Sequence, residues 1–470
     1  MELKQEALMK TLLASVSSLV LAGVLLSPAA SAPSAKRFSP HQEPRGIGNL
    51  VVPGDRVALV YDAGVKGATG SVFVRSDKQR DFRRLTLSPE RGPSSTYRTR
   101  VPANLLRGHE LLYYAVLRAP TGRRTARVPS KGTSSAWILQ QSRLVNLGVH
   151  RFGETREPEA VVASASADQV GWQIHPPECG CGPSFGPQSF AVGRDRSIWL
   201  HDSLNDRMLV WNPDAPDTIV RSVPLPERTA DNDVALGPAG TIYVTSGVGS
   251  GLNYRIVLNR LSPTGQLLWQ SRLAGDFFGH GSFLIGVNSS LRYRPDGTLN
   301  VLASMNGLPG GEQAWMPVAT RQGQPLSRAQ QLRRAQWPSQ PVGNGLRLVS
   351  ELYTRVVDGA PHEARFALID RSDHVIRSWR IASRTAISFD VATPEVVGRD
   401  VVAVVDAARP GEIDHIVFRL SPSGAESHFS LPVVVFGDNI LADVRVGPDG
   451  KLYELGSSPE TGIVISRYSL

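Results

Sequence analysis

A short pattern of apolar and turn-forming residues recurs along the second half of the chain. One copy runs from Asp233 to Tyr243, and another runs from Asp443 to Tyr453. Weaker copies lie at 189–199 and 294–301. Each copy holds a short apolar segment, a turn rich in Gly, Pro or Asp, and a second apolar segment, which predicts two adjacent antiparallel strands joined by a tight turn.

The copies return with a spacing of about 50 residues, which is typical of a β-propeller. Their positions predict six blades, with seven as the alternative because residues 307–341 have an irregular pattern. The last blade has apolar segments for only three strands. We therefore expect residues 145–151 to supply the fourth, outer strand and to close a propeller that spans residues 145–470.

A different set of β-rich segments fills residues 48–140. Turn signals separate these segments at 62–64, 88–89 and 120–122. This spacing predicts an antiparallel β-sandwich that precedes the propeller, so the expected fold class is all-β throughout. The segment Leu111–Leu117, followed by a Thr-Gly turn, resembles bacterial immunoglobulin-like or fibronectin-III-like modules. Residues 33–47 have no periodicity and are expected to form a flexible lead-in.

One predicted blade carries a more specific pattern. Residues 197–211 read as a strand, Asp202, a loop containing Asn205 and Arg207, and a second strand. This resembles the NHL repeat, and the whole second region is similar to NHL-like and regucalcin-like propellers. In the NHL family the Asn and Arg pin the loop between two strands. The resemblance therefore implies a structural role for Asp202, Asn205 and Arg207.

The N-terminus predicts export from the cell. Lys4 and Lys10 precede an apolar run from Leu12 to Leu26, and small residues follow at 27–32. This order is that of a secretory signal peptide over residues 1–32. The run is shorter than the ~20 residues that a spanning helix needs, although an uncleaved anchor is the alternative. We expect a secreted, extracellular protein.

Cys179 and Cys181 are the only cysteines in the sequence. Export permits a disulfide between them, and Gly180 gives the backbone freedom that such a tight ring requires. Free thiols, or a metal or redox site, are the alternatives.

Positive charge is concentrated in the first region. Residues 36–143 carry 20 Lys and Arg against 7 Asp and Glu, whereas residues 145–470 carry 29 against 33. A basic surface of this kind attracts anionic partners, and an exported protein meets envelope polymers and acidic polysaccharides. A solvated Arg-rich surface is the alternative. No aromatic stacking pattern accompanies the basic residues, so nucleic acid is not an expected partner.

Candidate site residues are scattered over the predicted propeller loops. We expect the loops between blades and those joining second to third strands to share one face above the channel. The candidate ligand-binding residues on that face are His201, Asp233, His280, Glu412, His415 and Asp443. As a general base, His280 would need Asp233 or Glu412 within hydrogen-bond reach. Glu412, Asp414 and His415 form the weak signal for a divalent cation.

The sequence lacks a nucleophile elbow, a phosphate-binding loop and a zinc-protease helix. It favours a binding or surface-interaction protein without a cofactor, whose basic domain contacts an anionic polymer and whose propeller holds a partner or small ligand. The alternative, implied by the resemblance to regucalcin-like propellers, is a lyase or lactonase that depends on Ca²⁺ or Mg²⁺. Its candidate catalytic residues are His280, Asp233 and Glu412.

Overall fold

The computed structural model describes residues 38–43, 47–90, 95–175, 185–187, 189–226, 233–248, 255–273, 291–294, 297–304, 313–334, 339–343, 345–354, 361–389, 394–421, 423, 426–433 and 443–470. The predicted signal peptide, most of the lead-in, Cys179, Cys181 and His280 lie outside these residues. The described residues contain no helix that is both long and apolar enough to cross a membrane.

The N-terminal region contains two β-sheets that share one buried cluster. The first sheet has the order β1 (His41–Gln42), β3 (Ala58–Asp62), β7 (Thr96–Arg100) and β6 (Ser88–Pro89). The second has the order β2 (Leu50–Val51), β10 (Ser134–Ile138), β8 (Glu110–Arg118), β4 (Thr69–Ser76) and β5 (Arg83–Thr86), with β9 (Thr125–Val128) paired to β8. Alternate residues of both sheets, such as Leu59, Tyr61, Val72 and Val74, meet in the shared cluster.

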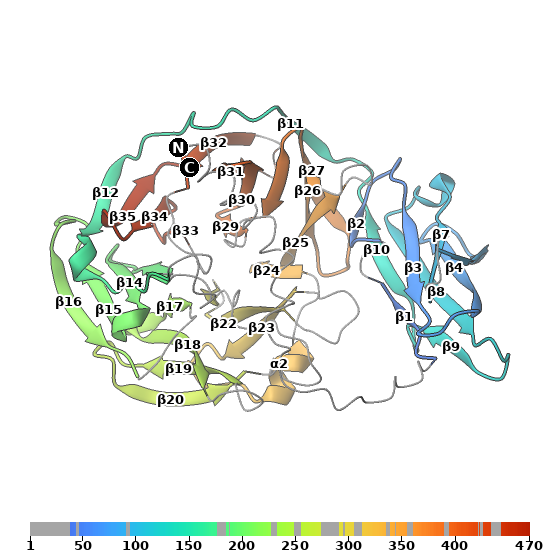
Figure 1. Ribbon diagram of the computed structural model, residues 1–470, viewed down its shortest axis with the longest axis horizontal. Coiled ribbons are helices and arrows are strands. Elements are labelled where there is room, and N and C mark those ends of the chain that lie inside the picture. Colours follow the sequence, from blue (N-terminus) through green and yellow to red (C-terminus); the bar gives the residue numbers. More distant parts are fainter. Residues whose placement is uncertain are drawn as a thin grey trace.

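The rest of the chain is a β-propeller, in which the sheets are arranged in a ring (Figure 1). We call the space about the centre of this ring the channel. The described residues form six such sheets, numbered I to VI along the chain. Sheet I holds β13 (Ser189–Val192), β14 (Ile198–Asp202), β15 (Arg207–Trp211) and β16 (Ile219–Pro224). Sheet II holds β17 (Val234–Leu236), β18 (Ile242–Val248), β19 (Arg255–Leu261) and β20 (Leu267–Arg272). Sheet III holds β21 (Leu291–Tyr293), β22 (Leu299–Ser304) and β23 (Gln313–Ala319), and the helix α2 (Arg328–Arg334) follows it.

The remaining three sheets complete the ring. Sheet IV holds β24 (Ser339–Gly343), β25 (Leu346–Thr354), β26 (Pro361–Ile369), β27 (Val375–Ser383) and β11 (Arg143–Gly148). Sheet V holds β28 (Ala386–Phe389), β30 (Asp400–Arg409), β31 (Glu412–Leu420) and β32 (Glu426–Pro432), with β29 (Glu395–Val397) also paired to β30. Sheet VI holds β33 (Val444–Val446), β34 (Leu452–Ser458), β35 (Gly462–Tyr468) and β12 (Ala160–Ala165). Short 3-10 turns lie at Ala103–Leu105, Ala167–Gln169, Ser203–Asn205 and Pro238–Gly240.

The recurring phrase forms the first two strands of its sheet, and its glycine has a packing role. A Cβ added to Gly237 would lie 2.7 Å from the ring of Tyr243. A Cβ added to Gly447 would lie 2.5 Å from the ring of Tyr453. In these two copies the tyrosine that ends the phrase therefore packs directly on the glycine that begins its turn, which explains why the two residue types recur together.

The ring is closed by β12, which pairs antiparallel with β35 in the last sheet. The prediction that residues 145–151 supply this strand is wrong. Most of that segment belongs to β11, which pairs parallel with β27 of sheet IV. Few residues separate β10 of the first region from β11, so β11 can reach only the sheet on which that region rests. A strand further along the chain reaches sheet VI.

The first region packs on sheet IV through a buried contact. Arg365 of β26 is 1% exposed and donates two hydrogen bonds to Asp55, at 2.6 and 2.9 Å. Its Nη1 also donates to the backbone oxygen of Leu50 at 2.8 Å. Apolar residues around this pair, including Leu50, Trp137 and Val349, form a separate buried cluster across the contact. Burial of apolar surface around a satisfied ion pair holds the two regions together.

A cavity at the turn end of the central channel

The innermost strands of the sheets line a cavity of about 820 Å³ in the channel. Its wall contains the second residue of four of these strands together with Ala191 of β13: Ala235, Arg292, Val396 and Arg445. The turns that follow the strands form its rim, including Arg194, Gly237, Gly398 and Asp449. The cavity therefore lies at the end of the channel where first strands turn into second strands. The predicted site was the opposite end, formed by the loops between blades.

Arg445 closes the inner end of this cavity. Its Nε donates to the backbone oxygen of Phe190 at 3.0 Å, and its Nη1 donates to that of Leu291 at 3.3 Å. Its Nη2 donates to Asp233 and, at 3.4 Å, to the hydroxyl of Ser189. The side chain is only 7% exposed. Through these hydrogen bonds Arg445, which belongs to sheet VI, connects the innermost strands of sheets I and III and the residue that precedes the innermost strand of sheet II.

Asp233 is fully buried beside Arg445. Its carboxylate accepts hydrogen bonds from the hydroxyl of Ser189 at 2.5 Å and from the backbone nitrogen of Leu291 at 2.5 Å. Burial raises the pKa of Asp233 to about 6, although the nearby Arg292 guanidinium and these hydrogen bonds act in the opposite direction. Asp233 was a predicted site residue. In the structure it is not among the residues that line the cavity, but it binds Arg445, which is.

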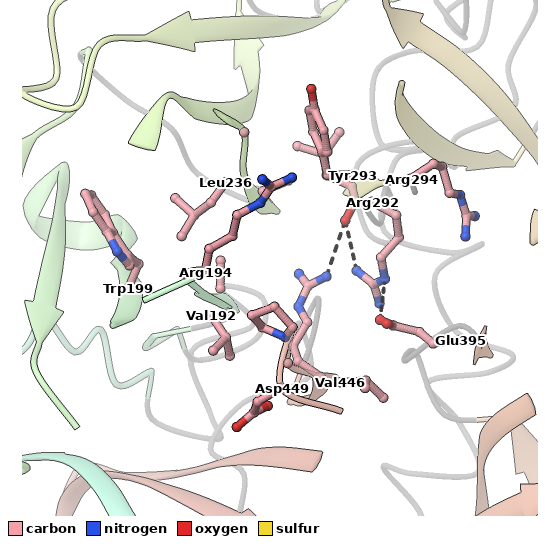
Figure 2. A pocket seen from close by; sticks show the side chains of 18 of the residues that line it. Val192, Arg194, Trp199, Leu236, Arg292, Tyr293, Arg294, Glu395, Val446 and Asp449 are labelled. Carbon is pink, nitrogen blue, oxygen red and sulfur yellow. Dashed lines mark hydrogen bonds and ion pairs between the residues drawn. The ribbon is translucent and has the colours of Figure 1, made fainter. Parts of the chain in front are cut away.

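Arg292 and Glu395 face each other across the cavity wall (Figure 2). The Nε of Arg292 lies 3.0 Å from Oε1 of Glu395, and its Nη1 donates to the backbone oxygen of Leu291 at 3.0 Å. Within the described part of the chain, the buried Nη2 of Arg292 has no hydrogen-bond partner. Burial raises the pKa of Glu395, while Arg292 and Arg294 lower it. Arg294 stacks over the ring of Trp315 at 4.3 Å.

His415 forms a second buried cluster, between sheets V and VI. Its Nδ1 lies 2.8 Å from Asp406, and its Nε2 lies 2.9 Å from Asp443. A neutral imidazole has a single N–H, so only the protonated ring donates to both carboxylates. Glu454 lies nearby and accepts a hydrogen bond from the hydroxyl of Tyr468 at 2.7 Å. Burial raises the pKa of Glu454 to about 7; Tyr468 and His415 lower it, and Asp443 raises it.

The expected cation site at Glu412, Asp414 and His415 does not come together. These residues lie on the strand β31, where neighbouring side chains point to opposite faces. Glu412 is paired with Arg409, and Asp414 accepts from the backbone nitrogen of Gly153 and lies 2.8 Å from His150. Among the described residues, one group places three possible ligand atoms within 4.8 Å of one another: His41, Glu43 and Asp62, which lie in the first region.

His201 and Asp202 both lie inside sheet I rather than in an open site. His201 is fully buried within β14. Asp202 accepts hydrogen bonds from Asn205 at 2.9 Å and from Arg207 at 2.8 Å. It also accepts one from the backbone nitrogen of Gly171 at 2.9 Å. Asp202, Asn205 and Arg207 therefore hold their loop, as predicted from the motif.

Sequence reasoning missed the arginines of the cavity. Arg292 and Arg445 each occupy the second position of an otherwise apolar innermost strand, where Ala235 stands in sheet II. A charged residue in that position of the recurring phrase is the signal that would have found them.

No family model matches this chain, and no curated protein matches it. Among solved structures, a streptogramin B lyase is 11% identical, with a TM-score of 0.28, and the match covers 63% of this chain and 96% of that one. The PQQ-bound aldose sugar dehydrogenase of Streptomyces coelicolor is 14% identical, with a TM-score of 0.36. The match covers 66% of this chain and 97% of the dehydrogenase. An ancestral GH74 enzyme is 10% identical, with a TM-score of 0.29. The match covers 92% of this chain and 65% of the GH74 enzyme. At these values the likenesses carry no argument about function.

Proposed function

We propose that this protein is an exported binding protein whose propeller holds a small ligand in the channel cavity. The cavity itself is the observation that carries the proposal. Pockets that bind small molecules measure about 300–1,000 Å³ and combine apolar walls with a few polar groups. The volume of about 820 Å³ lies in this range, and the wall joins Val192, Leu236 and Val446 to a small set of charged side chains.

The second part of the proposal concerns the basic first region, which contacts an anionic envelope polymer. The choice of an anionic partner is supported by aromatic and arginine side chains of the larger sheet of this region. Phe73 and Tyr114 stack on neighbouring strands with ring centroids 4.8 Å apart. The guanidinium of Arg127 lies 4.1 Å from the centre of the Tyr114 ring, and that of Arg75 lies 5.0 Å from the Phe82 ring. Stacking on a ring holds a guanidinium flat. Nη1 of Arg127 donates to the backbone oxygen of Pro129, and Nη1 of Arg75 donates to that of Gln79. The proposal assigns the remaining N–H groups of Arg127 to a carboxylate or phosphate.

In this proposal the buried contact between Asp55 and Arg365 links the polymer-binding first region to the ligand-binding propeller. A first region held on sheet IV keeps the channel cavity at a set distance and orientation from the polymer. The polymer-binding region then positions the ligand-binding one at the cell envelope.

The proposal is tested with the chain expressed from Lys36. Its melting temperature is measured with a library of small metabolites, with anionic polysaccharides, and with Ca²⁺, Mg²⁺ or Mn²⁺, at low and high salt. A ligand that binds only the folded state raises the melting temperature by mass action. We expect a rise with a small metabolite, and a rise with polysaccharide that disappears at high salt. A rise with a divalent metal alone would instead favour the lyase or lactonase.

The metal-dependent alternative gains no specific support from the described residues. Its candidates Glu412 and Asp233 are held by Arg409 and Arg445, respectively. The loop that was expected to bind a cation is a strand whose acidic side chains have other partners.

A further inference from the structure

We infer that the channel cavity binds a small molecule with an anionic headgroup on an apolar body, and that the headgroup lies between Arg194 and Arg292. This inference rests on the proposed function and names the class of its ligand. A carboxylate and a phosphate share the required chemistry, since both present oxygen atoms to a guanidinium.

The first argument is the state of Arg292. Its side chain is 7% exposed, and an arginine in a protein stays protonated. Nη1 has an acceptor, and Nε lies 3.0 Å from Glu395, but neither Nε nor Nη2 makes a hydrogen bond within the part of the chain that the structure describes. A buried donor of a charged group is costly when it has no acceptor. Because Arg292 lines the cavity, an anionic ligand bound there would supply a further acceptor to this side chain.

The second argument is the concentration of arginines in the cavity wall. Arg292, Arg294 and Arg445 line it and are buried. Among the described residues, Glu395 pairs with Arg292, and Asp233 pairs with Arg445. A wall that gathers arginine side chains attracts a ligand with a negative charge.

The third argument is the rim of the cavity. Arg194 is exposed on the turn after β13, and its side chain extends toward Tyr293 (Figure 2). Among the described residues, the two acidic residues of the rim are bound within their own turns. Asp195 accepts from the hydroxyl of Ser197 at 2.6 Å, and Asp449 accepts from the hydroxyl of Tyr453 at 2.8 Å. Arg194 is thus placed to attract an anion and to contact it from the open side.

The apolar part of the ligand follows from the rest of the wall. Val192, Leu236, Tyr293 and Val446 come from four different innermost strands and face the same space (Figure 2). An apolar body would bury these side chains further, whereas a fully hydrated ion such as inorganic phosphate would leave them in contact with water.

The test compares probes that share one body and differ in headgroup. Binding of hexanoate, hexyl phosphate, hexanamide and hexylammonium to the full chain is measured by titration calorimetry. We expect the two anions to bind, and the amide and the ammonium to bind at least about tenfold more weakly. The ratio of the two anions shows whether the site prefers a carboxylate or a phosphate.

Three variants locate the headgroup. R194Q should weaken the binding of both anions about tenfold. R196Q is the matched control, because Arg196 is an exposed arginine of the same turn that does not line the cavity; it should leave affinity unchanged. E395Q should strengthen anion binding, since it removes the carboxylate that competes for Arg292.

Equal affinity for hexanoate and hexanamide, or equal effects of R194Q and R196Q, would overturn the inference and leave a small-ligand cavity in place. Failure of all four probes to bind would also overturn it. The proposed function falls only if the wider metabolite screen finds no ligand whose binding is lost in a variant that fills the cavity, such as A235W.

Discussion

Asp233 and Asp443 occupy the same position in the recurring phrase but have different partners. Each precedes the innermost strand of its sheet, and the backbone oxygen of each accepts from the second strand: from Thr245 at 3.3 Å and from Leu455 at 2.7 Å. Both side chains are buried. Asp233 is bound by Arg445 across the channel, whereas Asp443 lies beside His415 of the neighbouring sheet.

The difference teaches that a repeat sets where a side chain lies without setting its chemistry. The partner of Asp233 comes from four sheets further along the chain, and that of Asp443 comes from the sheet immediately before it. Arginine always carries its charge, whereas burial raises the pKa of Glu454, which belongs to the second cluster, to about 7. The first cluster should therefore act as a permanent structural link, and the second should respond to pH.

The largest expected effect belongs to Asp233→Asn. The change leaves the buried guanidinium of Arg445 without its carboxylate, so it should lower the free energy of unfolding by about 3–5 kcal/mol. Urea denaturation measures this loss. Asp214→Asn, at an exposed position, is the control and should stay within about 0.5 kcal/mol of the wild type. A loss of the same small size at Asp233 would show that the link across the channel is not structural.

Glu454→Gln should change how stability depends on pH. The pKa of Glu454 in the folded protein is about 7, above its ordinary value of 4.5. Its contribution to stability is therefore complete below pH 4.5 and is lost as the pH rises through 7. Relative to the wild type, the variant should gain about 3 kcal/mol between these two pH values. Urea denaturation across this range measures the gain, and a difference that does not vary with pH would contradict it.

Asp443→Asn should cost less than Asp233→Asn, because His415 keeps its second carboxylate, Asp406. We expect a loss of about 1–3 kcal/mol in the free energy of unfolding. The variant should also narrow the pH effect of Glu454, since Asp443 raises the pKa of that residue. Urea denaturation of the wild type and of Asp443→Asn over the same pH range checks both expectations. Equal losses at Asp233 and Asp443 would remove the contrast between the two clusters.

The smallest effect is expected for Ser189→Ala. The hydroxyl of Ser189 donates one hydrogen bond to Asp233, and its loss should cost about 1 kcal/mol. The double variant Ser189→Ala/Asp233→Asn should lose less than the sum of the two single changes, because both remove the same bond. Exact additivity in urea denaturation would mean that Ser189 and Asp233 act independently.

Much of the fold was predictable because it depends on local patterns. The Gly and Tyr of the phrase pack on each other within one hairpin, so their spacing is visible in the sequence. The same holds for the loop of Asp202, Asn205 and Arg207, whose contacts lie within a few residues of one another. The closing strand was misplaced because apolar pattern alone does not distinguish β11 from β12. Their assignment depends on where the first region rests.

The candidate site was less predictable. Glu412 and His415 are close in sequence, yet the pleat of β31 turns them to opposite faces. The cavity arginines come from separate sheets, and their meeting point depends on how the ring closes.

The sequence by itself determined that this chain is all-β, that its second region is a propeller built from a repeated hairpin, and that positive charge gathers in its first region. Strand alternation, turn residues and charge are properties of short segments, which explains why they could be inferred directly. Only the tertiary structure decided which end of the channel holds the described cavity and which buried acid meets an arginine. Those choices depend on contacts between residues that lie far apart in the chain.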